Sequence, residues 1–375
     1  MRVLLINKRA PFDGLGAERV IWDIGNRFAA EGHDVTFFCP TPDDAEVPDR
    51  EGVSFNFVDI PGGETRKQIE FFLRAAPKYR AVYNEVDPDL VYDNPSPFPF
   101  HLAHFCGEAP VVSKVHTIYR RDAFFAKDHP LVKVGTIIGE ETYRLFRNEL
   151  FTPVSHSTAG RLESLVQTGK NKIVTNLNGT DTTQFEFSFD PGSKQVLYLS
   201  KLGRKKGIKV LLRAWEKVEA QSRDSNLVVA GSGPLEADAK ALADRLELSR
   251  VEFAGYVSES RKKELFRESL IYTLPTYIEG MPLTPLEAMA SGCAVVSTDT
   301  YGVRDIITDG ESGRLVPTGD RNALADALLE LLDDLKRARE FAKRGAQRAG
   351  ELSLDRMLNA EMEIVKDWLT ERKRA

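Results

Sequence analysis

The chain has 375 residues, of which 42% are hydrophobic and 29% charged, and it contains 27 glycines and 19 prolines. These values exclude collagen-like and disordered proteins, and at roughly 100–200 residues per domain the length favours two domains. The 51 lysines and arginines and the 56 aspartates and glutamates give a net charge of −5, which excludes a globally basic nucleic-acid binder.

Short apolar runs alternate with amphipathic stretches, the pattern of parallel sheets covered by helices. The first series opens with a strand at Arg2–Asn7, a glycine-containing loop and a helix whose apolar positions repeat from Ala17 to Phe28. Further strands are predicted at Asp34–Cys39, Val53–Ile60, Leu90–Tyr92, Val111–Val115 and Phe151–Val154.

A turn-rich segment from Asn178 to Gly192 interrupts this pattern and is long enough to join two domains. A second series of strands follows at Gln195–Leu199, Asn226–Ala230, Val251–Ala254, Ile271–Leu274 and Ala294–Ser297. Beyond residue 320 the chain is predicted to be helical to its end. We therefore predict an α/β protein with Rossmann-like domains over 1–185 and 186–352, and a final helix over 353–375 that packs on the first domain through Leu358, Met362, Val365 and Leu369.

The loops after the strands are the expected ligand sites, because ligands of open parallel sheets bind at the carboxyl ends of the strands. In the first such loop Gly14 and Gly16 would let an anion approach the backbone, or would simply form a tight turn. The third glycine and the acidic residue of a dinucleotide site are missing, which disfavours a dehydrogenase. Asp87-Pro88-Asp89 looks like a metal-binding pair but precedes its strand and so lies at the opposite edge.

Basic residues and glycines follow the first two strands of the second domain. Lys201 ends a strand and Lys206 begins the next helix, so both ammonium groups can converge on a diphosphate; alternatively both are solvated surface lysines. Gly231 and Gly233 form another junction of strand, glycine and helix, which is a weak signal by itself.

Two glutamates lie eight positions apart in the segment from Pro275 to Gly292. Glu279 is expected on the loop after a strand, where it can bind a sugar hydroxyl, and Glu287 in the following helix, where it can accept two hydrogen bonds from a ribose. The alternative is that Glu287 is an ion-paired helix residue.

These segments resemble family 4 of the GT-B glycosyltransferases, retaining enzymes that transfer a sugar from a nucleotide diphosphate to an acceptor. The resemblance spans nearly the whole chain and rests on five segments in order: Leu15-Gly16-Ala17-Glu18, His116 after an apolar strand, Leu177-Asn178-Gly179-Thr180-Asp181, Lys201 with Lys206-Gly207, and Glu279 with Glu287.

The resemblance implies that the C-terminal domain holds the donor, with Glu287 on the ribose and Lys201 and Lys206 on the diphosphate. It implies catalytic roles for Glu279, against the transferred sugar, and for His116. The nucleotide sugar is a substrate, with a UDP-sugar favoured over a GDP-sugar, and no metal or other cofactor is expected because lysines and helix amides can stabilise the departing diphosphate. Further donor contacts are implied for Gly16, Gly231, Gly233, Gly280, Met281 and Leu283.

Pro282 departs from the family pattern, because it stands where the family has a second glycine and has no N–H to offer a ligand. The identity of the donor sugar therefore stays open. A nucleotide-sugar epimerase of the same architecture and a non-catalytic sugar-nucleotide binding protein are the alternative functions.

Basic and aromatic residues are interleaved in Glu64–Tyr83 and Tyr119–Val134. Such segments suit a lipid-linked acceptor or an anionic membrane surface, or else pack on their own sheet with the basic residues in water. We expect a glycan or lipid-linked acceptor and no nucleic-acid partner. No apolar run is long enough to span a membrane, so we expect a cytoplasmic protein, and the inner face of the cell membrane is the surface that these segments would contact if they do not pack on their own sheet. The candidate contact residues are Arg120, Arg121, Phe124 and Phe125.

Overall fold

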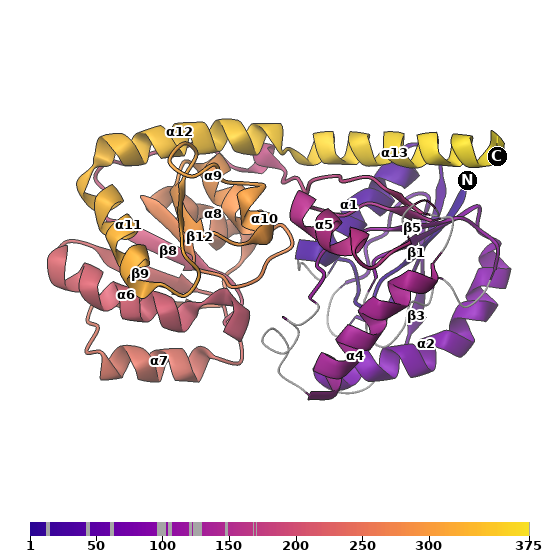
Figure 1. Ribbon diagram of the computed structural model, residues 1–375, viewed down its shortest axis with the longest axis horizontal. Helices are drawn as coiled ribbons and strands as arrows, with labels where there is room; N and C mark the ends of the chain where they lie inside the picture. The colour runs from indigo at the N-terminus through magenta and orange to yellow at the C-terminus, as the bar shows by residue number, and fades with distance from the viewer. Residues whose placement is uncertain are drawn as a thin grey trace. The chain divides into compact units, whose positions relative to one another are not determined.

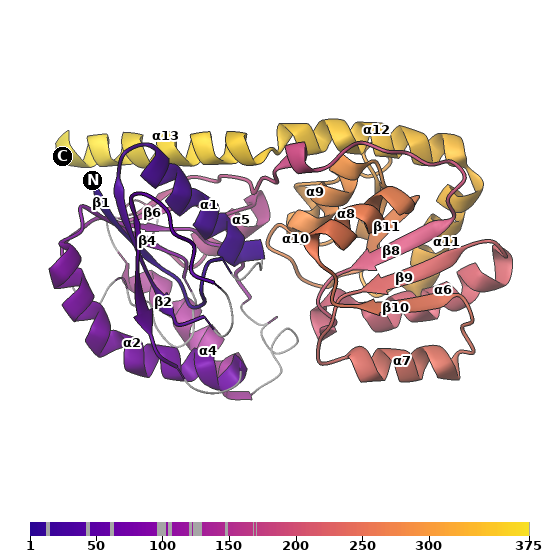
Figure 2. The same cartoon turned by 180° about the vertical axis from the view of Figure 1, so that it is seen from behind.

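The structure, a computed structural model, divides into two compact units (Figures 1 and 2). Unit 1 comprises Met1–Leu177 and Met357–Ala375, and unit 2 comprises Asn178–Arg356. Residues 178–185, assigned above to the first domain, thus group with unit 2, and the end of the chain returns to unit 1. The structure describes residues 1–12, 16–42, 46–60, 64–95, 103, 107–119, 122, 130–146, 149–167, 169 and 171–374, with the backbone alone at 64–73, 130 and 131.

Among its described residues, unit 1 contains a seven-stranded sheet in the order β3-β2-β1-β4-β5-β6-β7. All of its strand pairs are parallel. The predicted strands are present, although β6 overlaps the predicted Phe151–Val154 at Phe151 alone, and among the described strands of this unit β7 was not predicted. The strands are β1 (Arg2–Ile6), β2 (Asp34–Pro40), β3 (Val53–Val58), β4 (Leu90–Asp93), β5 (Val111–Ser113), β6 (Leu150–Phe151) and β7 (Lys172–Ile173).

Helices cover both faces of this sheet (Figures 1 and 2). On one face Tyr79 and Val82 of α2 pack with Leu4 and Ile6 of β1. The opposite face is covered by α1 and α13, because Tyr92 of β4 contacts a ring on α1 and a carboxylate on α13. The helices of unit 1 are α1 (Gly16–Ala30), α2 (Glu64–Val86), α4 (Pro130–Glu141), α5 (His156–Glu163) and α13 (Leu354–Arg374).

The final helix α13 binds to unit 1 through a buried ion pair as well as through apolar residues. The Nζ of Lys114 lies 2.6 Å from Oε2 of Glu361, and both side chains are 0% exposed. Tyr92 donates its hydroxyl proton to Oε1 of Glu361 at 2.5 Å. The predicted inward face is therefore partly wrong, because Met362 and Leu369 are only half-buried. The buried residues of α13 are Met357, Leu358, Glu361, Val365 and Trp368.

Among its described residues, unit 2 contains a six-stranded parallel sheet in the order β10-β9-β8-β11-β12-β13. The five predicted strands are confirmed, and the three-residue β13 was not predicted. The strands are β8 (Gln195–Leu199), β9 (Asn226–Ala230), β10 (Val251–Gly255), β11 (Ile271–Leu274), β12 (Ala294–Thr298) and β13 (Arg314–Val316).

The helices of unit 2 form a layer on each face of its sheet (Figures 1 and 2). The helices α6, α7 and α11 lie on one face, and α8, α9 and α12 lie on the other. Helical structure beyond residue 320 is confirmed by α11, α12 and α13. The helices of this unit are α6 (Ile208–Gln221), α7 (Glu236–Arg245), α8 (Glu259–Glu268), α9 (Leu283–Ser291), α10 (Tyr301–Arg304), α11 (Arg321–Asp333) and α12 (Leu335–Glu351).

The order of strands reverses once in each sheet, between β1 and β4 in unit 1 and between β8 and β11 in unit 2. At such a reversal the crossover helices lie on opposite faces and leave a crevice at the carboxyl ends of the two strands. The loops after β8 and β11 are the ones that carry the candidate lysines and Glu279.

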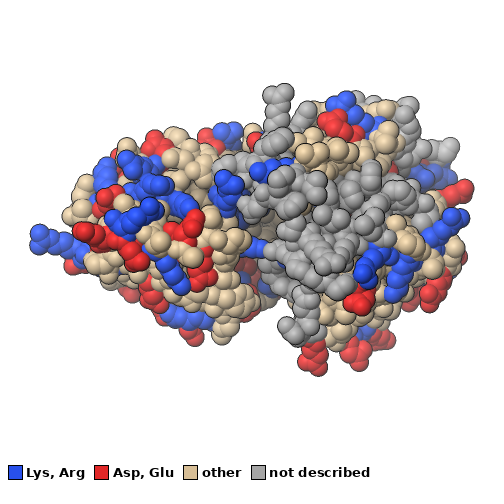
Figure 3. All heavy atoms as spheres, turned by 90° about the horizontal axis from the view of Figure 1, so that it is seen from below, with Lys and Arg blue, Asp and Glu red and all other residues tan. Residues whose placement is uncertain are grey.

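The described surface carries both signs of charge. On the face drawn in Figure 3 basic and acidic side chains of the described residues are interspersed. Within the described part of the chain, no helix has the length and apolar character that a membrane span requires.

We predict that Glu361→Gln lowers the free energy of unfolding by about 3–5 kcal/mol, because removing one partner of a buried ion pair leaves the other uncompensated. The ammonium of Lys114 and its hydrogen bonds outweigh burial and lower the pKa of Glu361. The ionised Glu361 therefore contributes its full share of the free energy of unfolding above pH ~4.3, the ordinary pKa of glutamate. This contribution is lost as the pH falls through the lower pKa that Glu361 has in the folded protein.

Urea unfolding of wild type and variant between pH 3 and 7 measures this difference. Glu363→Gln, an exposed position on the same helix, is the matched control. Equal stability of the wild type and Glu361→Gln at pH 7 would contradict the assignment.

Candidate functional site

The loops that follow β8 and β11 pack directly on one another at the reversal point of unit 2. The amide of Tyr277 donates to the carbonyl of Lys205 at 2.7 Å. Gly207, at φ 72°, lies so close to the second loop that a Cβ there would be 1.8 Å from the carbonyl oxygen of Pro275. Glycine is therefore required at this position for both its left-handed backbone and the close approach.

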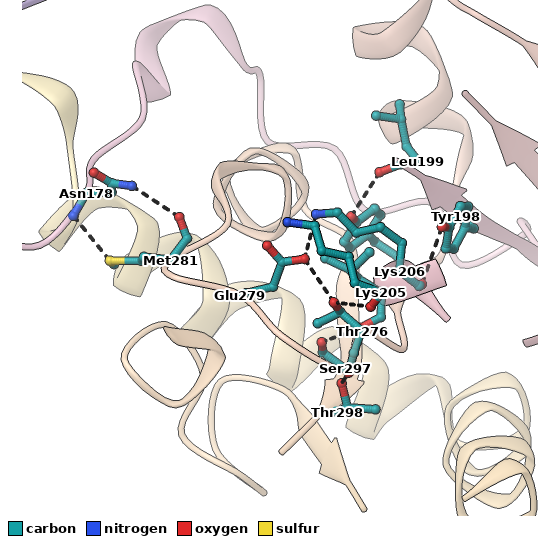
Figure 4. Close-up of polar contacts among 12 residues, drawn as sticks. Asn178, Tyr198, Leu199, Lys205, Lys206, Thr276, Glu279, Met281, Ser297 and Thr298 are labelled. Atoms are coloured by element: carbon teal, nitrogen blue, oxygen red, sulfur yellow. Dashed lines mark hydrogen bonds and ion pairs between the residues drawn. The ribbon is translucent and has the colours of Figure 1, made fainter. Parts of the chain in front are cut away.

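Lys206 and Glu279, predicted from separate motifs, are brought into contact (Figure 4). Lys206 Nζ lies 2.5 Å from Oε1 of Glu279, whose side chain is 8% exposed. The hydroxyl of Thr276 lies 2.9 Å from the same oxygen and 2.8 Å from the carbonyl oxygen of Lys205. Thr276 was not singled out from the sequence, although it stands in the same segment as Glu279.

The surroundings of Glu279 keep its carboxylate ionised. Burial alone would raise the pKa of this group. The ammonium groups of Lys206 and Lys205, with hydrogen bonds from Lys206 and Thr276, outweigh burial and hold the pKa below its ordinary value. The result is a buried carboxylate that carries a negative charge at neutral pH.

The segment after Glu279 connects the site to the start of unit 2. Asn178 donates its side-chain amide to the carbonyl of Met281 at 3.1 Å, and its backbone N–H points at the Met281 sulfur at 3.2 Å (Figure 4). Leu283 is the first residue of α9, and among the described side chains none caps that helix, whose N-cap position is Pro282. The positive end of α9 is thus directed at the loop that holds Glu279 and Gly280.

Glu287 lies inside α9 and is paired with a lysine that the sequence did not reveal. Lys262 of α8 places its Nζ 3.2 Å from Oε1 of Glu287 and 2.8 Å from Oε2 of Glu259. Side-chain exposure is 10% for both Lys262 and Glu287. Lys262 stands in a charged run, Arg261-Lys262-Lys263-Glu264, so nothing in the local sequence pattern distinguishes it from its less buried neighbours.

The remaining donor candidates of unit 2 lie on the adjacent loops. Lys201 is exposed on the loop after β8. Gly231 and Gly233 have φ 125° and 157°, and a Cβ on them would approach the carbonyl oxygens of Ser200 and Leu202 to 2.1 and 2.6 Å. Both glycines are therefore required by the backbone packing of these loops, whatever ligand contacts they make.

In unit 1, His116 follows β5 and is only half-buried, but its Nε2 is covered and has no hydrogen-bond partner among the described residues. Burial and the nearby charges of Lys114 and Lys8 lower the pKa of His116 to about 3, so its imidazole is neutral. Gly16 is the exposed first residue of α1. Gly14, Arg120, Arg121, Phe124 and Phe125 lie outside the described residues.

The acidic pair before β4 is occupied by an arginine. Arg2 lies 3.0 Å from Asp87 and 3.6 Å from Asp89, and its backbone N–H donates to Asp89 at 2.7 Å. The expected position at the amino-terminal edge of the sheet is confirmed. Within the described ranges, no group of three or more histidine, cysteine, aspartate or glutamate side chains is arranged to hold a metal.

Sequence models of two glycosyltransferase families match consecutive parts of the chain. Glycosyltransferase Family 4 matches residues 15–184, and glycosyl transferases group 1 matches residues 180–348. The chain is also 25% identical over 329 residues to the phosphatidyl-myo-inositol mannosyltransferase of Mycolicibacterium smegmatis, covering 84% of this chain and 81% of that protein.

Solved structures of the same fold align over nearly the full length. Sucrose-phosphate synthase from Thermosynechococcus elongatus has a TM-score of 0.84 at 19% identity, covering 98% of this chain and 99% of that one. HepE of Anabaena, solved in complex with UDP and glucose, has a TM-score of 0.77 at 16% identity, with the same coverage of 98% and 99%.

The fold is thus GT-B, with two Rossmann-like parallel-sheet units and a helical C-terminus. The chain belongs to family 4 of the GT-B glycosyltransferases and is a glycosyltransferase. The resemblance stated from the motifs is confirmed.

We predict that Gly302→Ala distorts the loop of Glu279. Gly302 of α10 donates its N–H to the carbonyl of Glu279 at 3.3 Å, and a Cβ on it would lie 1.6 Å from the carbonyl oxygen of Gly280. The loop must move, so the variant should lose about 1–3 kcal/mol of stability and bind the donor more weakly.

Thermal unfolding and donor titration check this prediction. Gly350→Ala in α12 is the control, because its added methyl group would meet no atom within 4 Å apart from its chain neighbours and the backbone of its own helix, and alanine favours a helix. Unchanged donor affinity in Gly302→Ala would show that the packing of α10 does not shape the site.

Proposed function

We propose that the chain is a retaining glycosyltransferase that moves a sugar from a nucleotide-diphosphate donor to a hydroxyl acceptor without a metal ion. The observation that carries this proposal is the contact between Lys206 and the buried, ionised Glu279 at the reversal point of the unit 2 sheet. A carboxylate and a cation side by side suit a reaction in which a sugar becomes positive while a diphosphate leaves as an anion.

In this reaction the diphosphate lies against Lys201, Lys206 and the positive end of α9. An ammonium has three donors, so Lys206 can bind Glu279 and a diphosphate oxygen together. These groups stabilise the negative charge of the leaving group, which is the role that a metal ion has in other enzymes of this kind.

Glu279 faces the transferred sugar and stabilises the positive charge that develops on it. Because the lysines hold its pKa low, Glu279 stays a carboxylate and does not act as a proton donor at neutral pH. His116, neutral at that pH, contacts the sugar by hydrogen bonding. Retention of the anomeric configuration follows the family pattern.

Relatives support a UDP-sugar donor and a glycan or lipid-linked acceptor. HepE of Anabaena is complexed with UDP and glucose, and the mycolicibacterial relative is named for mannosyl transfer to a phosphatidyl-inositol lipid. A GDP-sugar is the second choice of donor. For a lipid-linked acceptor, we propose that the enzyme acts at the inner face of the cell membrane.

The experiment is a thermal-shift screen with UDP, GDP, ADP, their common sugar conjugates and NAD. A ligand at 100 times its dissociation constant stabilises by about 2.7 kcal/mol, so the true donor should raise Tm selectively. A chain stabilised by none of the nucleoside diphosphates would refute donor binding. Retention is then read from the anomeric configuration of the product.

We predict that Glu287→Ala weakens donor binding by about tenfold or more, because it removes the acceptor of the ribose hydroxyls, and that Lys262→Met weakens it through misplacement of Glu287. Calorimetric titration with the donor from the screen measures both. The neighbouring Lys263→Met, at a half-buried lysine for which no contact with Glu287 is recorded, is the control. Wild-type affinity in Glu287→Ala would contradict the ribose assignment.

A further inference from the structure

A buried ion pair lies two residues from His116. Lys114 follows β5, and strand pairing continues past it, because its N–H donates to Asp93 at 2.9 Å and Val154 donates to Val115 at 3.1 Å. Alternate side chains of an extended strand share a face. Lys114 and His116 therefore lie on one side of the sheet, the side reached by Glu361 of α13.

The partners of Glu361 bind both of its carboxylate oxygens. Oε1 accepts from Tyr92 at 2.5 Å, and Oε2 accepts from Lys114 at 2.6 Å and from the side-chain amide of Asn176 at 2.5 Å. Lys114 also donates to the carbonyl of Asn176 at 3.2 Å. These hydrogen bonds place the ammonium and the carboxylate in one defined arrangement.

Attachment of α13 does not by itself explain this pair. Leu358, Val365 and Trp368 already bury an apolar stripe of the helix, and well-packed apolar residues often stabilise as much as a buried ion pair. What the pair adds is a balance of charge, because the ammonium of Lys114, which acts on His116, is matched by a carboxylate.

Two ammonium groups act on His116, that of Lys8 after β1 and that of Lys114 after β5. Lys114 is paired with Glu361 of α13, which also accepts the hydroxyl proton of Tyr92 of β4. Burial and the two lysines favour a neutral imidazole. Only Glu361 among these groups is negative.

We propose that Glu361 is a positioning residue for sugar transfer, because it neutralises Lys114 and so keeps that ammonium from acting on the surroundings of His116 as an uncompensated cation. The inference rests on the proposed role of His116 at the transferred sugar. That sugar becomes positively charged in the transition state, and an unmatched ammonium nearby would raise the barrier. The last helix of the chain thereby contributes to catalysis without touching the substrate.

Charge-changing variants test this proposal. Glu361→Gln leaves Lys114 unmatched and should lower kcat by about tenfold or more, with KM for the donor from the screen within about twofold of wild type. Lys114→Met leaves the carboxylate unmatched, so the pKa of His116 should rise by at least about one unit, read by NMR of histidine-labelled protein. The acidic limb of the kcat profile should move with it.

The double variant K114M/E361Q removes both charges. It should recover most of the kcat lost in Glu361→Gln and return the pKa of His116 toward the wild-type value. Because the double variant leaves neither the ammonium nor the carboxylate buried without its partner, it should also fold better than either single variant. All assays are normalised to folded protein, and Glu363→Gln is the control.

A structural role alone predicts a different result. The variants would then lose Tm, while kcat per folded molecule and the pKa of His116 stay at wild-type values, and this outcome overturns the proposal. Equal losses of kcat in the double variant and in Glu361→Gln would also overturn it. A wild type that transfers no sugar from any donor of the screen refutes the proposed function, whereas the His116 pKa measurement separately reports whether the pair controls that histidine.

Discussion

Burying a carboxylate is the constraint around which the site residues of this protein are arranged. A buried carboxylate needs a cation or several hydrogen bonds to remain ionised. Glu279, Glu287 and Glu361 are each paired with a lysine from another element: Lys206, Lys262 and Lys114. Each pair joins segments distant in sequence, so the requirement for charge compensation also determines which loops and helices lie together.

Parallel strands with crossover helices place these pairs where they can act. The carboxyl ends of β8 and β11 lie side by side at the reversal point of their sheet, which brings Lys206 and Glu279 together. Glycines at 207 and 302 let neighbouring backbones pass within contact of this loop. Rigid backbone packing therefore supports the polar groups of the site.

Local sequence patterns were sufficient to predict most of the strands and helices of the fold. Alternating apolar runs and helical periodicity located every long strand and the terminal helices, because these elements bury a continuous face. The two-residue β7 and three-residue β13 were missed, whereas the equally short β5 and β6 were found because they overlap longer predicted runs, Val111–Val115 and Phe151–Val154. The inward face of α13 was partly misjudged because Glu361, a charged residue, occupies a position that the pattern treats as exposed.

The sequence by itself determined the GT-B class, the family and the loops that carry Lys206, Glu279 and Glu287, because motif spacing and strand ends are local properties. Only the tertiary structure decided which charges meet. Lys262 and Lys114 look like ordinary surface lysines in the sequence, and their carboxylate partners are 25 and 247 positions away. Pairing across such distances depends on how helices pack on a sheet, and local sequence patterns do not record that packing.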